Sequence, residues 1–335
     1  MDEIIHIDKA SVTPRYQQII NAVLQGIQAN QLKKGDKIPS LNYYKQKFQL
    51  SQDTVLTAYN ELKARGIIAS AVGKGYYIAS NGSSIIHKIF VLFDNLTAYK
   101  ETLYNAMKDA LGKKGTLDIF FHHANKELFQ KLVEEAAGKY TAYVIMPLEN
   151  KSQLKCLNQL PEKQLFLLDR GRSFSSEKYT GVFQNFAADT YQALEQGSEL
   201  IKKYNQLFIV TNDHRHHLQE IVSGCHSFCQ HNRLKFNHIK NIEEVIVKAG
   251  DAFLVINDRG LVSLVEQIEK LGLTIGSQVG IISYNDTPLK QIAAGGITTI
   301  STDFVAMGKN ITDLILNRQK SRIDNPAQLI IRNSL

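Results

Sequence analysis

Residues 35–78 have the sequence GDKIPSLNYYKQKFQLSQDTVLTAYNELKARGIIASAVGKGYYI, and this stretch decides the fold of the N-terminal part of the chain. Ser40 and Ser51 are suited to begin two helices, because a serine side chain can accept a hydrogen bond from the first helical turn. Gly66 is suited to end the helix that begins at Ser51. Two short apolar strands, residues 67–72 and 76–78, then follow with a Gly-Lys-Gly tip between them. The pattern predicts a helix-turn-helix followed by a β-hairpin wing.

A further helix is predicted upstream, with Thr13 as its N-cap and Pro14 at its first position, where a missing N–H costs nothing. The three predicted helices each have one apolar face, which we expect to be buried. These inward positions are Tyr16, Ile19, Ile20, Val23 and Ile27 in the first helix, Leu41, Tyr44 and Phe48 in the second, and Val55, Ala58 or Tyr59, and Leu62 in the third. Residues 1–79 are therefore predicted to form a winged helix-turn-helix domain.

This segment resembles the DNA-binding domain of the GntR family of bacterial transcription regulators. The resemblance is carried by Tyr16-Gln17-Gln18-Ile19, Gly35-Asp36-Lys37-Ile38-Pro39-Ser40, Ser51 with Thr54-Val55, Ala58-Tyr59-Asn60-Glu61-Leu62, Arg65-Gly66-Ile67-Ile68 and Gly73-Lys74-Gly75. The family usually has Glu-Arg where Leu41-Asn42 stands, and arginine where Gln52 and Leu56 stand. The usual arginine contacts with guanine are thus missing, and a glutamine or asparagine contact with adenine is the natural substitute.

The resemblance implies that the third helix lies in the major groove, and that other exposed polar residues contact phosphates. Gln52 and Thr57 are expected to contact bases, and Arg15, Lys63 and Lys74 to contact phosphate. The full set of predicted DNA-binding residues is Arg15, Ser40, Asn42, Ser51, Gln52, Thr54, Thr57, Lys63 and Lys74. The competing interpretation is a winged helix that binds another protein.

The charge distribution favours DNA as the partner. Residues 1–80 contain ten basic and six acidic residues, a net charge of +4, whereas the whole 335-residue chain has +7. The basic excess per residue is thus concentrated in the predicted DNA-binding domain, as phosphate neutralisation requires.

The remaining composition indicates a cytoplasmic protein of more than one domain. No apolar run is long enough to span a membrane, and the chain does not begin with a signal peptide pattern. Three cysteines do not suggest a disulfide framework. Residues 80–86 begin with Ser80-Asn81-Gly82-Ser83-Ser84, which is small and polar, and they are predicted to be a flexible linker.

From residue 87 onward, short apolar runs alternate with amphipathic helical patterns, which is typical of parallel sheets covered by helices. The predicted strands are Ile89–Phe93, Leu117–Phe121, Ala142–Met146, Leu165–Leu168, Leu207–Val210, Phe253–Ile256 and Val279–Ser283. The predicted helices are Glu101–Leu111, Glu127–Ala137, Asp189–Tyr204, Leu218–Asn232, Leu261–Leu271 and Phe304–Arg318. No glycine-rich phosphate loop follows any of these strands, so a nucleotide cofactor is not indicated.

Residues 87–335 resemble the sugar-sensing core of lac-repressor-type regulators, which is related to periplasmic sugar-binding proteins. The matching stretches are Phe93-Asp94-Asn95, Tyr143-Val144-Ile145-Met146-Pro147, Leu167-Leu168-Asp169-Arg170, Val255-Ile256-Asn257-Asp258, residues 280–289 (GIISYNDTPL), Ile297-Thr298-Thr299-Ile300, and Phe304 with Met307-Gly308. The resemblance implies a fold of the α/β class, with two α/β subdomains joined by crossing strands and a ligand cleft between them.

In open parallel sheets, ligands bind beyond the carboxyl ends of the strands. Asp94, Arg170, Asp258 and Asp286 each follow an apolar strand pattern, so they are predicted to bind sugar hydroxyls, while Asp169 is expected to orient Arg170. An aromatic side chain, Tyr99 or Phe183, is expected to cover the apolar face of the sugar ring. The alternative is that these acidic residues cap strand ends or form ion pairs.

The segment His214-Arg215-His216-His217 adds a further candidate. The family commonly has an arginine three residues before the glycine that is Gly224 here, and this chain has Ile221 instead. His216 is therefore a candidate for hydroxyl recognition. A metal site with Cys225, His226 and Cys229 is an alternative role for this segment, but a structural zinc site is not predicted, because no second Cys/His set with finger spacing exists. A solvent-exposed loop is the competing interpretation.

Together these patterns predict a ligand-responsive transcription regulator, and repression is the working hypothesis. It is expected to bind a pseudo-palindromic double-stranded DNA operator as a homodimer and a small sugar as effector, with no cofactor, no metal and no membrane partner. One alternative is an effector domain that only dimerises or that binds a different metabolite. Another is an enzyme fused to a DNA-binding domain, but the lysine and phosphate motifs of an aminotransferase-like domain are missing, so no catalytic residues are predicted.

Overall fold

The computed structural model describes residues 6–8, 11–71, 73, 75–79, 87–148, 153–172, 179–211 and 215–335. The chain divides into two compact units. One consists of Met1–Asn95, Lys108–Leu148 and Ser152–Phe166, and the other of Leu96–Met107, Glu149–Lys151 and Leu167–Leu335. The predicted linker, residues 80–86, lies outside the described residues, so the predicted domain boundaries stay predictions.

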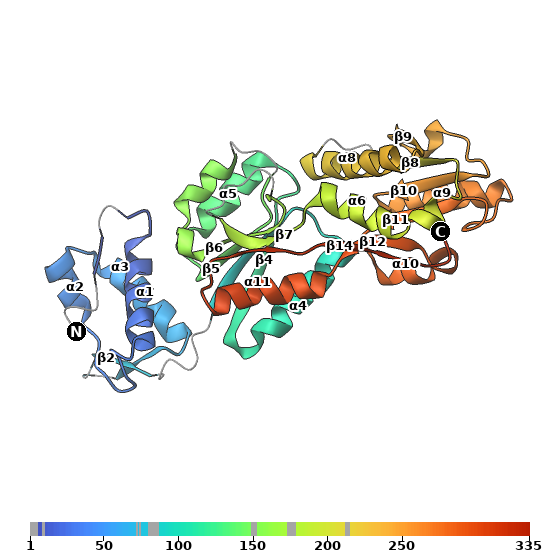
Figure 1. Cartoon of the computed structure of the whole chain (residues 1–335). Helices are drawn as coiled ribbons and strands as arrows, with labels where there is room; N and C mark the ends of the chain where they lie inside the picture. Colours follow the sequence, from blue (N-terminus) through green and yellow to red (C-terminus); the bar gives the residue numbers. More distant parts are fainter. Residues whose placement is uncertain are drawn as a thin grey trace. The chain divides into compact units, whose positions relative to one another are not determined.

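The N-terminal residues form three helices and a hairpin, drawn in blue in Figure 1. They are α1 (Arg15–Gln28), α2 (Leu41–Phe48), α3 (Gln52–Ala64), β1 (Ile68–Ala71) and β2 (Gly75–Ile78). The two strands pair antiparallel. The segment before α2 pairs with β2 on its other side, since Ile38 N donates to Tyr76 O and Ile78 N donates to Asp36 O, both at 2.9 Å. The wing is thereby anchored to the helices.

The core of this domain contains the apolar faces that the helical periodicity predicts. Ile19, Ile20, Val55 and Leu62 have no exposed surface, and neither do Tyr44, Ala58 and Tyr59. Ser40 and Ser51 cap α2 and α3 as predicted, accepting from Tyr43 N and Thr54 N at 3.3 Å. The predicted Thr13 cap is wrong: α1 begins at Arg15, and its N-cap is Pro14, whose side chain has no acceptor to offer.

The described residues from 87 onward form two six-stranded sheets. The first has the strand order β13-β7-β6-β5-β3-β4. Its strands are β3 (His87–Phe93), β4 (Gly115–Phe121), β5 (Ala142–Ile145), β6 (Leu165–Asp169), β7 (Thr180–Phe183) and β13 (Arg322–Asp324). β3 pairs parallel with β4 and β5, and β7 pairs parallel with β13. The connecting helices are α4 (Ala98–Leu111) and α5 (Lys126–Ala136).

The second sheet has the strand order β14-β12-β11-β10-β8-β9, and only its edge strand β14 is antiparallel to its neighbour. Its strands are β8 (Gln206–Val210), β9 (Lys235–Ile239), β10 (Asp251–Val255), β11 (Gly280–Tyr284), β12 (Thr298–Thr302) and β14 (Ala327–Ile330). The associated helices are α6 (Phe186–Gln196), α7 (Ser198–Ile201), α8 (His216–His231), α9 (Asp258–Lys270) and α10 (Pro288–Ile292). The helix α11 (Phe304–Leu316) follows β12 in the chain but packs on β7 of the first sheet.

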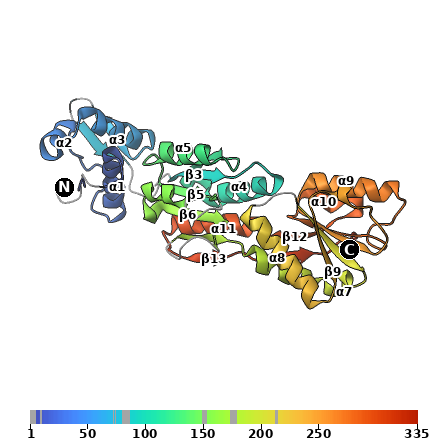
Figure 2. The same cartoon turned by 90° about the horizontal axis from the view of Figure 1, so that it is seen from above.

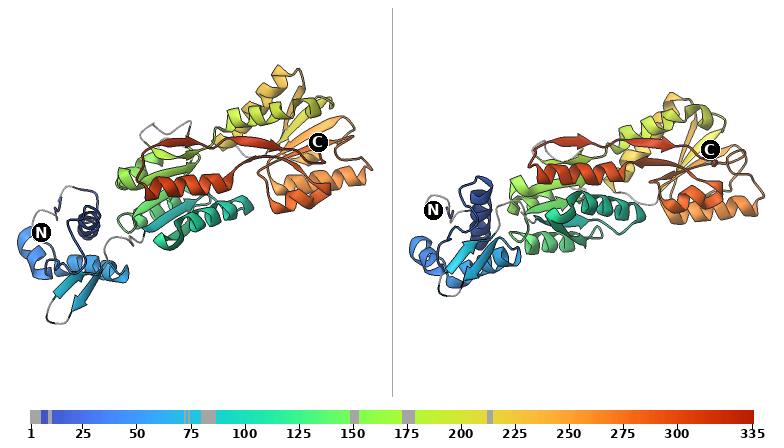
Figure 3. Two further views of the ribbon diagram at one scale, coloured as in Figure 1. Left: turned by 60° about the horizontal axis from the view of Figure 1, so that its bottom comes forward. Right: turned by 90° about the horizontal axis from the view of Figure 1, so that it is seen from below.

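Alternate residues of the second sheet enter two separate apolar cores. Leu207, Leu254 and Ile282 pack with residues of α6 and α8. Their neighbours in sequence, including Phe208 and Phe253, pack with residues of α9. Since successive side chains of a strand point to opposite faces, the sheet is covered by helices on both sides. Figures 2 and 3 show α8 on one face and α9 with α10 on the other.

All seven strands and all six helical patterns predicted for residues 87–335 are present, and the predicted α/β class is confirmed. One predicted helix is too long: residues 189–204 contain two helices, α6 and α7, which meet at Gly197. A Cβ at Gly197 would collide with Leu329 Cδ2, so β14 packs directly against this break. β7, β9, β12, β13, β14 and α10 have no counterpart among the predicted elements. None of the helices in the described part of the chain has the length and apolarity that crossing a bilayer requires.

Candidate functional site

The third helix of the N-terminal domain presents a polar face to solvent. Gln52, Asp53, Thr57, Asn60 and Lys63 are exposed on α3, while the opposite face is in the core. The side chain of Thr57 donates to Asp53 O at 2.8 Å, so its methyl group is the part that remains available for apolar contact. This face is suited to the major groove of DNA.

The other predicted DNA-binding residues have varied surroundings. Arg15 and Asn42 are exposed at the first turns of α1 and α2. Ser40 and Ser51 are exposed but act as helix caps, and Thr54 Oγ1 lies 2.8 Å from Ser51 Oγ. Lys74 lies outside the described residues. The contacts of all these residues with DNA stay predictions.

In the second sheet, the carboxyl ends of β10 and β11 carry two of the predicted ligand residues, Asp258 and Asp286. Asp258 is the first residue of α9, and 73% of its side chain is exposed. Its Oδ1 lies 3.1 Å from Lys290 Nζ. Lys290 is buried in α10 and also donates to the carbonyl oxygens of Tyr284 (2.8 Å) and Asn285 (3.0 Å). The ammonium therefore joins the β11–α10 loop to the start of α9.

The surroundings of Lys290 offset the cost of burying its ammonium group. Burial lowers the pKa of the ammonium, and the carboxylates of Asp258 and Asp286 oppose that shift. Two carbonyl oxygens and one carboxylate replace the water that a buried cation loses.

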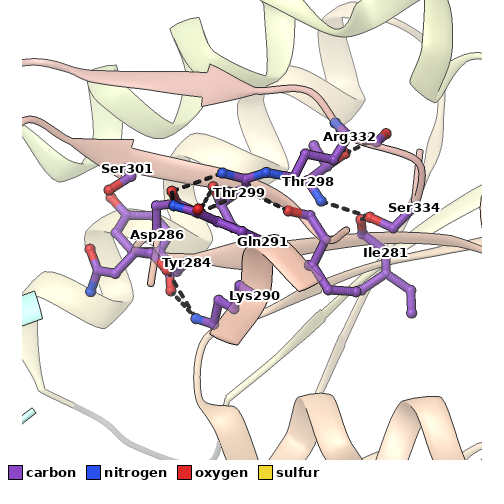
Figure 4. A network of polar contacts seen from close by, with 12 residues as sticks. Ile281, Tyr284, Asp286, Lys290, Gln291, Thr298, Thr299, Ser301, Arg332 and Ser334 are labelled. Carbon is purple, nitrogen blue, oxygen red and sulfur yellow. Dashed lines mark hydrogen bonds and ion pairs between the residues drawn. The ribbon is translucent and has the colours of Figure 1, made fainter. Parts of the chain in front are cut away.

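Asp286 is enclosed by donors, as Figure 4 shows. Arg332 donates to Oδ1 at 2.8 Å and to Oδ2 at 2.9 Å, Thr299 donates to Oδ1 at 3.0 Å, and Gln291 donates to Oδ2 at 3.3 Å. Burial would raise the pKa of this carboxyl, but the hydrogen bonds from Arg332 and Thr299 outweigh burial and hold the pKa below its ordinary value. Because four donors already occupy the carboxylate, we leave Asp286 out of the ligand site proposed below.

At the end of β6, Asp169 and Arg170 are both buried, and Arg170 Nε lies 3.7 Å from Asp169 Oδ2. Gln184, which follows β7, donates through Nε2 to Asp169 Oδ1 and through its backbone N–H to Asp169 O. Asp169 has a φ of 68°, in the left-handed region that is uncommon outside glycine. That Asp169 orients Arg170 stays a prediction.

Several polar atoms near these strand ends were not singled out by the sequence. Tyr284 OH, Thr190 Oγ1, Gln184 Oε1 and Asn285 Oδ1 are buried and lack a hydrogen-bond partner of good geometry among the described residues. Asn285 has a φ of 62°, so the loop after β11 turns sharply there. Native proteins rarely leave buried polar atoms unsatisfied, so such a group points to a bound water or ligand. A signal was present in the sequence, since Asn285 and Gln184 directly follow strands.

The surroundings of Tyr284 are acidic. Burial raises the pKa of its hydroxyl, the nearby Thr190 hydroxyl lowers it, and the carboxylates of Asp189, Asp169 and Glu220 raise it further. Burial also raises the pKa of Asp189 to about 6, against the effect of backbone hydrogen bonds from Asn185 and Ala327. Three carboxylates thus lie close enough to the Tyr284 hydroxyl to act on its pKa.

The two predicted aromatic residues differ in exposure. Tyr99 is half-buried in the first turn of α4, and its ring stacks on Phe304 with centroids 4.5 Å apart. Phe183 is fully buried, and the guanidinium of Arg322 lies 4.4 Å from its ring centroid. Phe183 is not included in the proposed ligand site because it is fully buried and covered by Arg322, whereas the half-buried Tyr99 keeps some exposed surface.

His216 is exposed at the first position of α8, and its Nδ1 lies 3.7 Å from Glu220 Oε2. Among the described residues, no group of three or more His, Cys, Asp or Glu side chains is placed to hold a metal ion.

Asp94 is buried at the end of β3 in the other unit, where its carbonyl accepts from His123 N at 2.7 Å.

Comparison with known proteins identifies both parts of the chain. Residues 15–78 match the family of bacterial regulatory proteins called the gntR family, and residues 201–335 match a periplasmic binding protein-like domain. The HTH-type transcriptional repressor YtrA of Bacillus subtilis is 35% identical over 106 residues, which are 32% of this chain and 78% of that protein.

Two further similarities extend over the C-terminal part. The arabinose metabolism transcriptional repressor of Geobacillus stearothermophilus is 19% identical and aligns over 98% of this chain and 97% of its own length. A LacI family transcriptional regulator of Enterococcus faecalis V583, crystallised with ribose, has a TM-score of 0.62 and 18% identity. The match covers 74% of this chain and 98% of that one. The expected periplasmic-binding-protein-like fold is confirmed, and the chain belongs to the gntR family of bacterial regulatory proteins as a DNA-binding transcriptional regulator.

Proposed function

We propose that this protein is a transcriptional repressor in the cytoplasm whose affinity for its operator is controlled by a small sugar. The sugar binds at the carboxyl ends of β6, β7, β10 and β11. Arg170 and Asp258 are retained from the sequence prediction, and Gln184, Tyr284 and Asn285 are added on the basis of the structure. Tyr99 and His216 stay candidates from the sequence.

The observation that carries this proposal is the set of buried polar atoms without hydrogen-bond partners at the ends of β7 and β11. Gln184 Oε1 and Asn285 Oδ1 are acceptors, and the Tyr284 hydroxyl can both donate and accept. Sugar hydroxyls can do the same, so they complement these groups. The relatives support the sugar class, because one regulates arabinose metabolism and a protein of the same fold was crystallised with ribose.

The proposal includes a homodimer on a pseudo-palindromic operator, because one winged helix makes too few contacts for specific affinity. Val262 on α9 and Leu289 and Ile292 on α10 support it, since their exposed fractions are 56%, 74% and 75%. These two helices lie on one face of the second sheet (Figures 2 and 3), and exposed apolar side chains on neighbouring helices are typical of a protein interface.

The ligand is sensed and not converted. The groups assigned to the ligand are amides, a hydroxyl and paired ions, and the assignment includes no nucleophile with an adjacent base. Incubation of a stabilising sugar with purified protein is expected to return it unchanged. Product in excess over protein would identify an enzyme instead.

The test is a thermal-shift screen of neutral monosaccharides, followed by operator titrations with and without each sugar that binds. A sugar at a hundredfold excess over its Kd is expected to stabilise the fold by about 2.7 kcal/mol. Such a sugar is also expected to change operator affinity. Asn285→Gly removes the amide without backbone strain, since glycine accepts a positive φ, and it is expected to abolish the response.

The matched control is Asn30→Gly, because Asn30 also has a left-handed φ, 56°, but lies at the end of α1. It should retain the sugar response. If no sugar stabilises the protein, or if a bound sugar leaves operator affinity unchanged, the proposed function is wrong.

A further inference from the structure

Three cations at or beside the proposed ligand site are already engaged by the protein's own carboxylates. Lys290 pairs with Asp258 at 3.1 Å, and Arg332 pairs with Asp286 at 2.8 Å. Arg170 lies 3.7 Å from Asp169. Each cation is thus matched by one carboxylate, and the three pairs together carry no net charge.

These pairs are held by additional contacts. Besides Asp258, Lys290 donates to two backbone carbonyls, and besides Asp286, Arg332 donates to Ile297 O at 2.7 Å. Figure 4 shows Lys290 beside the Tyr284 carbonyl, and Arg332 between Asp286 and the strand that carries Thr298 and Thr299. Among the described residues of these three pairs, an anionic ligand would have to displace the carboxylates to reach a cation, or lie beside the carboxylates.

Uncharged groups beside these pairs have buried atoms that lack hydrogen-bond partners among the described residues, and the guanidinium of Arg170, whose buried Nε makes no hydrogen bond of good geometry, is balanced by Asp169 at 3.7 Å. The uncharged groups are the side-chain carbonyls of Gln184 and Asn285 and the hydroxyls of Tyr284 and Thr190. The charges that act on Tyr284 are the carboxylates of Asp189, Asp169 and Glu220, and a like charge brought close to them is repelled. Neutral hydroxyls can satisfy the amides and hydroxyls without this repulsion.

We infer that the effector is an uncharged sugar, and that the site rejects phosphorylated sugars. This inference rests on the proposed function and adds the chemical class of the ligand. Specificity arises here from the protein's own ion pairs, because a phosphate group beside them faces carboxylates that already balance the three cations.

The test uses the full-length protein with matched pairs of probes: D-ribose with D-ribose 5-phosphate, and D-glucose with D-glucose 6-phosphate. Further neutral sugars that stabilise the protein are then compared with their own phosphates. Calorimetric titration gives each Kd. A neutral sugar is expected to bind at least about 100-fold more tightly than its phosphate.

A charge variant makes the test independent of the choice of sugar. Asp258→Asn removes the carboxylate that balances Lys290, while the ammonium keeps its two carbonyl partners. It is expected to reduce the preference for the neutral sugar over its phosphate by about 10-fold, because a positive charge at the site is no longer offset. Glu269→Gln, an equal charge change at an exposed position in the last turn of the same helix, should leave the preference unchanged.

The outcomes separate the two hypotheses. A sugar phosphate that binds as tightly as its neutral parent overturns this inference but leaves sugar sensing intact. If Arg259→Ala then loses the binding of the phosphate, the exposed arginine of α9 is the cation that binds it. If wild type and Asp258→Asn have the same preference for the neutral sugar over its phosphate, the inference is also contradicted. If no neutral or phosphorylated sugar binds, the proposed function fails, and this inference fails with it.

Discussion

Arg332 holds Asp286 through two hydrogen bonds, of 2.8 and 2.9 Å, although the two residues are 46 positions apart in the chain. The pair connects the residues after β14 to the loop after β11. Nearby, Ser334 donates to Ile281 O at 2.7 Å and accepts from Thr298 N at 2.7 Å. The C-terminal segment therefore stabilises the loop that carries Asn285.

Replacing Arg332 with methionine is expected to lower the free energy of unfolding by about 1–3 kcal/mol, because it leaves a partly buried carboxylate without its main partner. Urea denaturation measures this change. Arg259→Met, at an exposed position on α9, is expected to change stability by less than about 0.5 kcal/mol. Equal losses in the two variants would mean that the pair does not stabilise the fold.

Asp189 gives the protein a specific pH dependence. Burial raises its pKa in the folded protein to about 6, above the ordinary 3.8. Between these values the folded state keeps the proton and the unfolded state loses it, so stability from this group decreases as pH rises from about 4 to 6. Each unit of pKa shift corresponds to about 1.36 kcal/mol. The free energy of unfolding of wild type relative to Asp189→Asn should therefore fall by about 3 kcal/mol over this range and then stay constant. Urea denaturation of both proteins across this pH range tests it, and a flat difference would contradict the assignment.

Base recognition and phosphate contact can be separated on α3. Gln52→Ala is expected to weaken the preference for one base at one base pair of each half-site. The binding free energy for an operator with the preferred base should become less favourable by about 1–3 kcal/mol. Lys63→Ala is expected to weaken binding to all sequences and to reduce the salt slope by about one. Binding to a randomised operator library at several salt concentrations measures both effects. Lys270→Ala, in α9, serves as the control, and binding that is indifferent to Gln52 would remove it from base recognition.

Sugar and operator are expected to influence each other equally. If the sugar changes operator affinity by a given factor, operator DNA must change sugar affinity by the same factor. Arg170→Ala and Asp258→Ala are expected to abolish the sugar response while DNA binding without sugar persists. Titrations of each ligand in the presence of the other measure the two factors. A normal response in Asp258→Ala would show that the ligand site was assigned to the wrong residues.

The apolar face of α9 and α10 can be tested through the oligomeric state. Ile292→Lys is expected to shift a dimer to monomers, because it places a charge in an apolar contact. Ile246→Lys is a matched control, since Ile246 is equally exposed, at 75%, but lies outside these helices. Sedimentation velocity distinguishes the two states. If both variants sediment like wild type, the dimer contact lies elsewhere.

The sequence by itself determined the local elements and the two domain types. Helical periodicity, the serine caps at Ser40 and Ser51, and the alternation of strands and helices depend on residues within one or two turns of each other, so they are visible in the linear chain. It also placed Asp258 and Asp286 directly after strands. The tertiary structure decided what these carboxylates do, because their partners, Lys290 and Arg332, come from other elements. Asp286 became a structural ion pair, while Asn285, its neighbour, kept an unsatisfied amide oxygen. Which of two adjacent polar residues is available for a ligand depends on the elements that pack around the loop, and no local pattern records that packing.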